Sequence, residues 1–117
     1  MRGLKIEYDK LPWKPVSDGV RYKPVLVQGC GASMVAFDPG TSHAPHSHDE
    51  VQIVFCLEGR MEFYVKDDQS ERIETLVPGQ VLALEAGVSH GAKALEKSLI
   101  LTVWNPMTRF TKDSVVV

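Results

Sequence analysis

Three of the four histidines in this sequence lie within six residues, at positions 43, 46 and 48, and the fourth is His90. On a strand, His46 and His48 point to the same side, because strand side chains alternate with a period of two. Two imidazoles on one face pack poorly in a core, but they chelate a borderline divalent metal ion well. The pair therefore indicates a metal site, and the alternative is a solvated polar loop with incidental histidines.

Gln52 supplies an oxygen atom close to this pair. It lies four residues after His48, in a strand-like run where Gln52, Val54 and Cys56 share one face. An unpaired buried amide costs about 1–3 kcal/mol, and a metal held by two imidazoles would satisfy its carbonyl oxygen. Far along the chain, His90 follows a glycine turn and precedes small residues at which a strand could start.

Short β-like runs must position these side chains. The runs are rich in valine, isoleucine, leucine and aromatic residues, and they cover residues 20–28, 32–38, 51–57, 61–66, 72–77, 81–86 and 98–104. Turn residues such as Pro-Gly and Asp-Asp separate them, and no stretch carries clear helix start and stop signals. Many short strands at near-even spacing predict an all-β fold, an antiparallel sandwich or barrel.

The run at residues 51–57 is apolar on both faces. Val51, Ile53, Phe55 and Leu57 share the face opposite Gln52. The outer face of a single small barrel should meet water, so an apolar outer face predicts a cover. We expect a homodimer, and the alternative is a second layer of the same chain.

Composition narrows the class of protein. The 117 residues fit one domain, which we take as residues 1–117. Thirteen basic and fifteen acidic residues give a net charge of −2, which predicts neither a nucleic-acid nor a membrane partner. The start of the chain lacks the long apolar core of a secretory signal. Two cysteines make no disulfide framework and indicate reduced thiols in a cytoplasmic protein.

Two stretches of the chain resemble the two motifs of the cupin superfamily. The first has the spacing Gly40, His46, His48, Gln52 and Gly59, with glutamine where the family usually has glutamate. The second has the spacing Gly79, Glu85, Gly87, His90 and Ala94, with Glu85 and Ala94 where the family usually has proline and asparagine. We expect the glycines to serve backbone geometry.

This resemblance implies a small single-domain cupin: a double-stranded β-helix, or jelly-roll barrel, of the RmlC-like type. It also implies one metal inside the barrel, held by His46, His48, Gln52 and His90. Three nitrogens and one oxygen suit Mn, Fe, Co, Ni, Cu or Zn. Glutamine in place of glutamate removes a negative charge, so the ion should be held less tightly and be a stronger Lewis acid.

The last strand resembles that of small pectin-degradation-type cupins, which open 4,5-unsaturated uronate monosaccharides to linear keto sugars. Those proteins usually carry an acid, an aromatic residue, Ser-Pro and an arginine. Here the matching positions are Thr102, Trp104, Asn105-Pro106 and Arg109. We predict substrate contacts from Thr102, from the Trp104 ring face and from Arg109 to a carboxylate. The alternative is a core tryptophan and a surface arginine.

No residue is assigned as the catalytic acid or base. A threonine is not a general base near neutral pH without a helper, and nothing in the sequence places Glu85 or Asp38 at the metal. His43 could be a fifth ligand or a proton shuttle, because its odd spacing sends it to a different side from His46 in an extended segment, but we favour a loop residue at the barrel mouth. Cys56 could line the cavity, and a structural role is favoured.

Three functions are weighed. The first is a metal-dependent isomerase or lyase acting on a small sugar acid or other polar carboxylate, such as an unsaturated uronate or keto sugar. The second is an Fe(II)-type cupin dioxygenase. The third is a non-enzymatic cupin that binds a small molecule.

Overall fold

The computed structural model describes residues 3–106 and 115–116 of the chain. The elements in order are a short 3-10 helix and eleven strands: η1 (Tyr8–Lys10), β1 (Lys14–Ser17), β2 (Val20–Val27), β3 (Cys30–Phe37), β4 (Ser42–His46), β5 (Val51–Glu58), β6 (Met61–Lys66), β7 (Glu71–Leu76), β8 (Val81–Leu84), β9 (Ser89–Ala94), β10 (Ser98–Asn105) and β11 (Val115–Val116). Each of the seven runs predicted from the sequence is a strand, and the predicted ends agree to within two residues.

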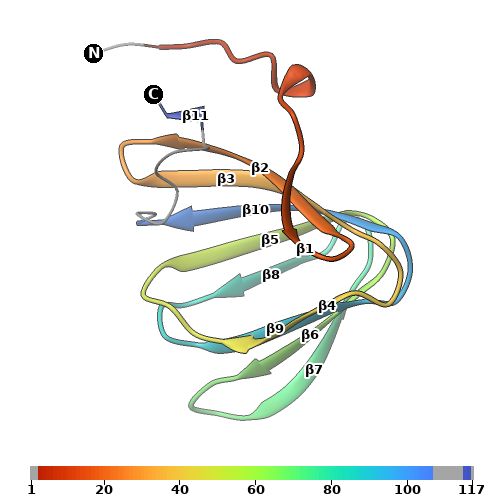
Figure 1. The fold of residues 1–117 in the computed structure, drawn as a ribbon. Coiled ribbons are helices and arrows are strands. Elements are labelled where there is room, and N and C mark those ends of the chain that lie inside the picture. Colours follow the sequence, from red (N-terminus) through yellow and green to blue (C-terminus); the bar gives the residue numbers. More distant parts are fainter. Residues whose placement is uncertain (1–2, 107–114, 117) are drawn as a thin grey trace.

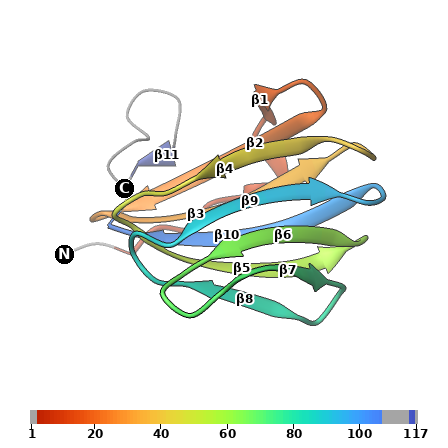
Figure 2. The same cartoon turned by 90° about the horizontal axis from the view of Figure 1, so that it is seen from below.

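The described strands form two antiparallel sheets around one interior (Figures 1 and 2). The larger sheet has the order β1-β2-β3-β10-β5-β8, with β11 added in parallel beside β2, and the smaller has the order β4-β9-β6-β7. Strands far apart in sequence are therefore neighbours. In particular, β10 lies between β3 and β5, and β9 lies between β4 and β6. This arrangement confirms the all-β jelly-roll prediction.

Alternating side chains build the core between the sheets. In β6, Met61, Phe63 and Val65 are buried and the residues between them are more exposed, as period-two strands with one buried face require. Val54 and Cys56 of β5 face them from the other sheet and are also buried. Gln52 lies on the same face of β5 as Val54 and Cys56, which confirms the prediction that its side chain points inward.

Four strands lie outside the seven predicted runs: β1, β4, β9 and β11. The β4 sequence contains a proline and two histidines, and β9 is made of small and polar residues around His90. Neither has the β-branched pattern that indicates a strand. Pairing with strong neighbours makes them strands, because β9 forms ladders with both β4 and β6.

The outer face of β5 is uncovered by any described element. Val51, Ile53, Phe55 and Leu57 are 37–44% exposed. The interpretation that a second layer of the same chain covers this face is therefore wrong for the described residues. Both cysteines are free in the structure. No helix among the described residues has the length and apolar character needed to cross a membrane.

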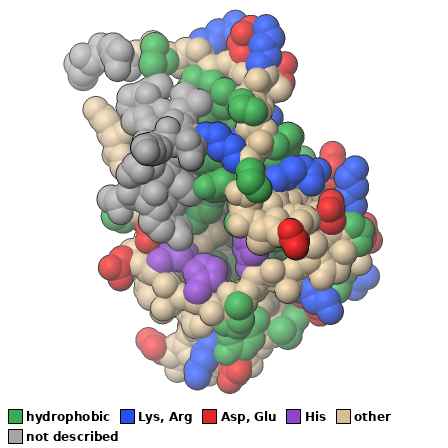
Figure 3. Space-filling view, viewed as in Figure 1, with side chains coloured by type: hydrophobic (Ala, Val, Ile, Leu, Met, Phe, Trp, Pro, Cys, Tyr) green, Lys and Arg blue, Asp and Glu red, His purple; other side chains and the backbone are tan. Residues whose placement is uncertain are grey.

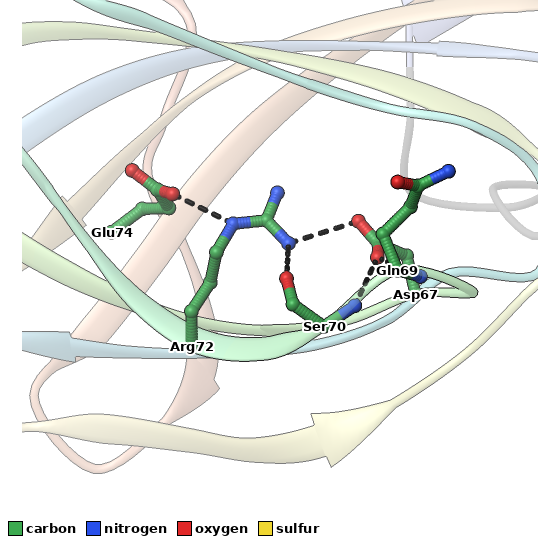
Figure 4. Close-up of polar contacts among 5 residues, drawn as sticks. All are labelled: Asp67, Gln69, Ser70, Arg72 and Glu74. Carbon is green, nitrogen blue, oxygen red and sulfur yellow. Dashed lines mark hydrogen bonds and ion pairs between the residues drawn. The ribbon is translucent and has the colours of Figure 1, made fainter.

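The turn between β6 and β7 is fixed by a polar network (Figure 4). Asp67 Oδ1 accepts hydrogen bonds from the backbone N–H groups of Gln69 and Ser70, at 2.9 and 3.0 Å. Arg72 donates to Asp67 Oδ2 at 2.9 Å and to Glu74 at 2.7 Å. The guanidinium, followed by these N–H groups, holds the pKa of Asp67 below its usual value.

Candidate metal centre

Three histidines converge at one end of the β4 and β9 ladder. His46 ends β4 and pairs with His90 of β9, while His48 lies two residues beyond the strand. The ring centroids of His46 and His90 are 4.6 Å apart, and those of His48 and His90 are 4.9 Å apart. One nitrogen from each ring lies within 4.8 Å of the others. Figure 3 shows histidine side chains gathered on one face of the molecule.

The convergence arises differently from the sequence interpretation. His46 and His48 were placed on one face of a single strand, but β4 ends at His46. The loop that follows brings His48 back toward the cluster, with 5.5 Å between the His46 and His48 ring centroids. His46 and His48 therefore lie close together as predicted, but a loop brings them together and not the alternation of side chains along one strand.

The backbone selects the same tautomer for all three rings. The Nδ1 atoms of His46, His48 and His90 lie 3.1, 3.0 and 2.9 Å from the carbonyl oxygens of Ala44, Glu50 and Val88. A carbonyl oxygen only accepts, so each Nδ1 carries the proton and donates. Each neutral ring then has its lone pair on Nε2, the atom that can bind a metal.

Gln52 brings an oxygen to the same place. Its amide nitrogen donates to Thr102 Oγ1 at 2.9 Å, and its Oε1 lies 3.1 Å from His48 Nε2. With the amide in this orientation, Oε1 and the deprotonated Nε2 are both acceptors, so a proton or a cation must lie between them. Two ligands bound at about 2.1 Å and at right angles are about 3 Å apart. The donor set therefore fits a metal ion.

A cavity of about 280 Å³ opens beside these four side chains. Its other walls are largely apolar and aromatic, and they include Trp104 and also Tyr22, Phe37 and Phe63. Trp104 is buried, packs against Leu26 and lines the cavity, so it has both the core position and the cavity position that were weighed. Thr102 is buried on the same wall. Arg109 lies outside the described residues.

His43 also lines the cavity, which corrects the expectation of a loop at the barrel mouth. It lies in β4 opposite Ala92, and a bulge between His43 and His46 changes the strand parity. The extra residue puts both rings on the cavity side despite their odd spacing. His43 Nε2 is buried without a hydrogen-bond partner among the described residues. Burial, followed by the charge of His46, lowers the pKa of His43.

The acids considered as bases lie elsewhere. Asp38 is paired with Arg21 at 3.5 Å and is exposed, and Glu85 lines a separate polar hollow with Asp67 and Asp68. Neither lines the cavity beside the histidines.

Sequence reasoning missed Glu50, which is 7% exposed. Its Oε2 lies 3.7 Å from His48 Nδ1. Glu50 lies in the bend before β5, so strand alternation gives no signal for its burial.

Comparison with known proteins identifies the family. Residues 33–104 match the family described as Cupin domain. The chain belongs to the cupin family. Among solved structures, this cupin is similar to KdgF from Halomonas sp., with 30% identity and a TM-score of 0.75 over 86% of this chain and 92% of that one.

Two more distant structures share the fold of this cupin. An RmlC-like cupin from Shewanella frigidimarina is 20% identical, with a TM-score of 0.76 over 93% of this chain and 95% of that one. Bacillus subtilis oxalate decarboxylase, described with Mn(II) centres, is 18% identical, with a TM-score of 0.78. This cupin is covered to 97% but spans 32% of that chain. No curated protein matches the sequence.

Proposed function

We propose that this cupin is a metal-dependent isomerase or lyase whose substrate is a small sugar acid, such as an unsaturated uronate or keto sugar. One observation carries the proposal: one ring nitrogen from each of three histidines lies within 4.8 Å of the others, and the carbonyl oxygen of Gln52 lies 3.1 Å from His48 Nε2, beside a cavity of about 280 Å³. A volume of this order suits a small ligand more than a polymer chain.

We infer that His46, His48, His90 and Gln52 hold the ion. The set of three nitrogens and one oxygen suits Mn, Fe, Co, Ni, Cu or Zn. When bound, the ion supplies Lewis-acid stabilisation of negative charge on a substrate oxygen. The chain orients these ligands before metal binding. Backbone carbonyls hold each imidazole in the metal-binding tautomer, and Thr102 accepts a hydrogen bond from the Gln52 amide.

The cavity residues fit a sugar-sized substrate. Trp104 offers a flat face for a ring, and Thr102 lies beside Gln52. His43 is our candidate for moving a proton, because its pKa is lowered and its neutral form can accept one near neutral pH. We also propose that Arg109 pairs with a carboxylate of the substrate. The resemblance of the last strand to that of small pectin-degradation-type cupins supports the uronate class.

Purified protein tests this function in two steps. Elemental analysis should find about one divalent transition ion per chain. Incubation with a 4,5-unsaturated uronate under argon should then consume the conjugated double bond, which is followed by ultraviolet absorbance, and yield a linear keto sugar. His46→Ala and Gln52→Ala should lose both the ion and turnover.

Other outcomes would overturn the proposal. Iron together with substrate-dependent oxygen consumption would indicate the dioxygenase. A protein that neither retains nor rebinds metal would indicate a non-enzymatic binding module. Full activity of both alanine variants would place the chemistry elsewhere.

We also propose that two copies of the chain pair through the outer face of the larger sheet. Ile53 and Phe55 of β5 lie beside Val103 and Leu101 of β10, and Phe55 also lies beside Val81 of β8. Ile53, Phe55 and Val81 are 40%, 37% and 50% exposed. A contiguous apolar patch of this kind favours a protein partner, and a second copy buries the same patch on both sides.

A further inference from the structure

We propose that the buried carboxylate of Glu50 supplies, from behind His48, the negative charge that the ligand set lacks, and thereby sets the affinity for the metal. This inference rests on the proposed metal site. It assigns Glu50 a positioning and electrostatic role, because it acts through His48 and does not itself reach the ion.

The geometry ties Glu50 to one ligand twice. His48 Nδ1 lies 3.0 Å from the Glu50 carbonyl oxygen, to which it donates its proton. The same nitrogen lies 3.7 Å from Glu50 Oε2. The carbonyl fixes the ring, and the carboxylate places a charge behind it. Metal binding at Nε2 withdraws electron density from the imidazole, so a carboxylate behind Nδ1 stabilises the bound form.

Burial makes this charge effective. The side chains of His48 and Glu50 are 10% and 9% exposed, so solvent and salt screen their interaction less than they screen an exposed pair. Asp49, the residue between them in sequence, is exposed. The chain thus presents one buried and one exposed carboxylate next to the same ligand, which offers a matched comparison.

The composition of the site explains why such a charge matters. Three neutral imidazoles and one carboxamide bring no charge to a dication. A glutamate at position 52 would bring one negative charge directly. Glu50 is two residues away, in the bend just before β5, so the structure places a carboxylate one layer further out. Partners of this kind typically change metal affinity by about 10–100-fold.

Calorimetric titration of the metal-free protein with Zn(II) and with Mn(II), at one fixed pH, measures the effect without any substrate. We expect Glu50→Gln to weaken binding by about 10–100-fold. Asp49→Asn, which removes the same charge from the exposed position, should change affinity less than about threefold. Thermal unfolding of each metal-free variant checks that the fold is kept.

A rescue variant tests the charge itself. In Glu50→Gln combined with Gln52→Glu, the carboxylate moves into direct contact with the ion, and affinity should recover to at least that of the native chain. Equal affinity of Glu50→Gln and the native chain would overturn this inference alone, as would equal losses in the Asp49 and Glu50 variants. Failure of the native chain to bind either ion would overturn the proposed function, and this inference with it.

Discussion

At the scale of single residues, the site is set by what each imidazole does with its second nitrogen. His46, His48 and His90 each donate Nδ1–H to a backbone carbonyl two residues away. His43 has no such partner for its buried Nε2 among the described residues. In the proposed function, three rings act as ligands through Nε2, and His43 is the candidate for moving a proton.

The lowered pKa of His43 makes a prediction about stability. Its folded pKa lies below the unfolded value of about 6.5, so between the two values the unfolded chain binds more protons. Stability from neutral His43 is therefore complete above about pH 6.5 and is lost as the pH falls toward the folded pKa. We expect the unfolding free energy of the metal-free protein to fall more steeply below about pH 6.5 in the native chain than in His43→Gln.

Urea denaturation in the presence of a chelator, at a series of pH values, measures this difference. Parallel curves for the native chain and His43→Gln would contradict the prediction.

Residue types and spacing predicted the positions of His46, His48, Gln52 and His90 around one point. They could not place His43, because strand parity reverses across a bulge and a bulge has no signature in this stretch. They also could not find the support of the site. The backbone carbonyls that orient the rings belong to residues of any type, so side-chain patterns carry no information about them.

At the scale of elements, strands rich in β-branched and aromatic residues can be predicted from the sequence, whereas β4 and β9 form because neighbouring strands pair with them. A glycine in β9 shows how. A Cβ at Gly91 would come within 3.0 Å of the His43 carbonyl oxygen and of the Pro45 nitrogen. A side chain at Gly91 would therefore require the bulged segment of β4 to shift by a few tenths of an ångström away from β9. Gly91 is not one of the glycines of the two motifs, so its role in the close packing of β4 on β9 is seen only in the structure.

The hydroxyl group of Tyr8 and the side chain of Lys23 link the N-terminal segment to the larger sheet. Tyr8 donates to the Lys23 carbonyl oxygen at 2.7 Å and accepts from Met34 N–H at 2.8 Å. It thus bridges β2 and β3 where these two residues pair. The Lys23 ammonium donates to the Tyr8 carbonyl at 3.0 Å and lies 4.5 Å from the Tyr8 ring and 4.8 Å from that of Trp13.

We expect Tyr8→Phe to lower the free energy of unfolding by about 1–3 kcal/mol, because the change leaves a backbone donor and a backbone acceptor without partners. Tyr64→Phe is the matched control. Its hydroxyl donates to Glu71 at the exposed surface, where water replaces the lost bond, so a much smaller change is expected. Urea denaturation of both variants provides the comparison, and equal losses would refute the bridging role of Tyr8.

At the scale of the whole molecule, the two sheets differ in what they leave outside. The smaller sheet exposes mainly polar positions between its buried ones, such as Glu62 and Lys66 of β6. The central part of the larger sheet exposes Ile53, Phe55 and Val81 side by side. The sequence predicted both apolar faces of β5, but it could not say what covers the outer one. The covering surface belongs to tertiary structure or to another molecule.

Substituting one side chain on each outer face tests the proposed pairing. Ile53→Lys puts a charge in the middle of the apolar patch, and we expect it to convert a dimer of the native chain to monomers, because a desolvated lysine without a partner opposes association. Ile73→Lys is the control, since Ile73 is 58% exposed on β7 of the other sheet and should leave the dimer intact. Sedimentation velocity at several concentrations measures both. A monomeric native chain would refute the proposed pairing. Loss of the dimer in Ile73→Lys alone would place the interface on the smaller sheet and not on β5.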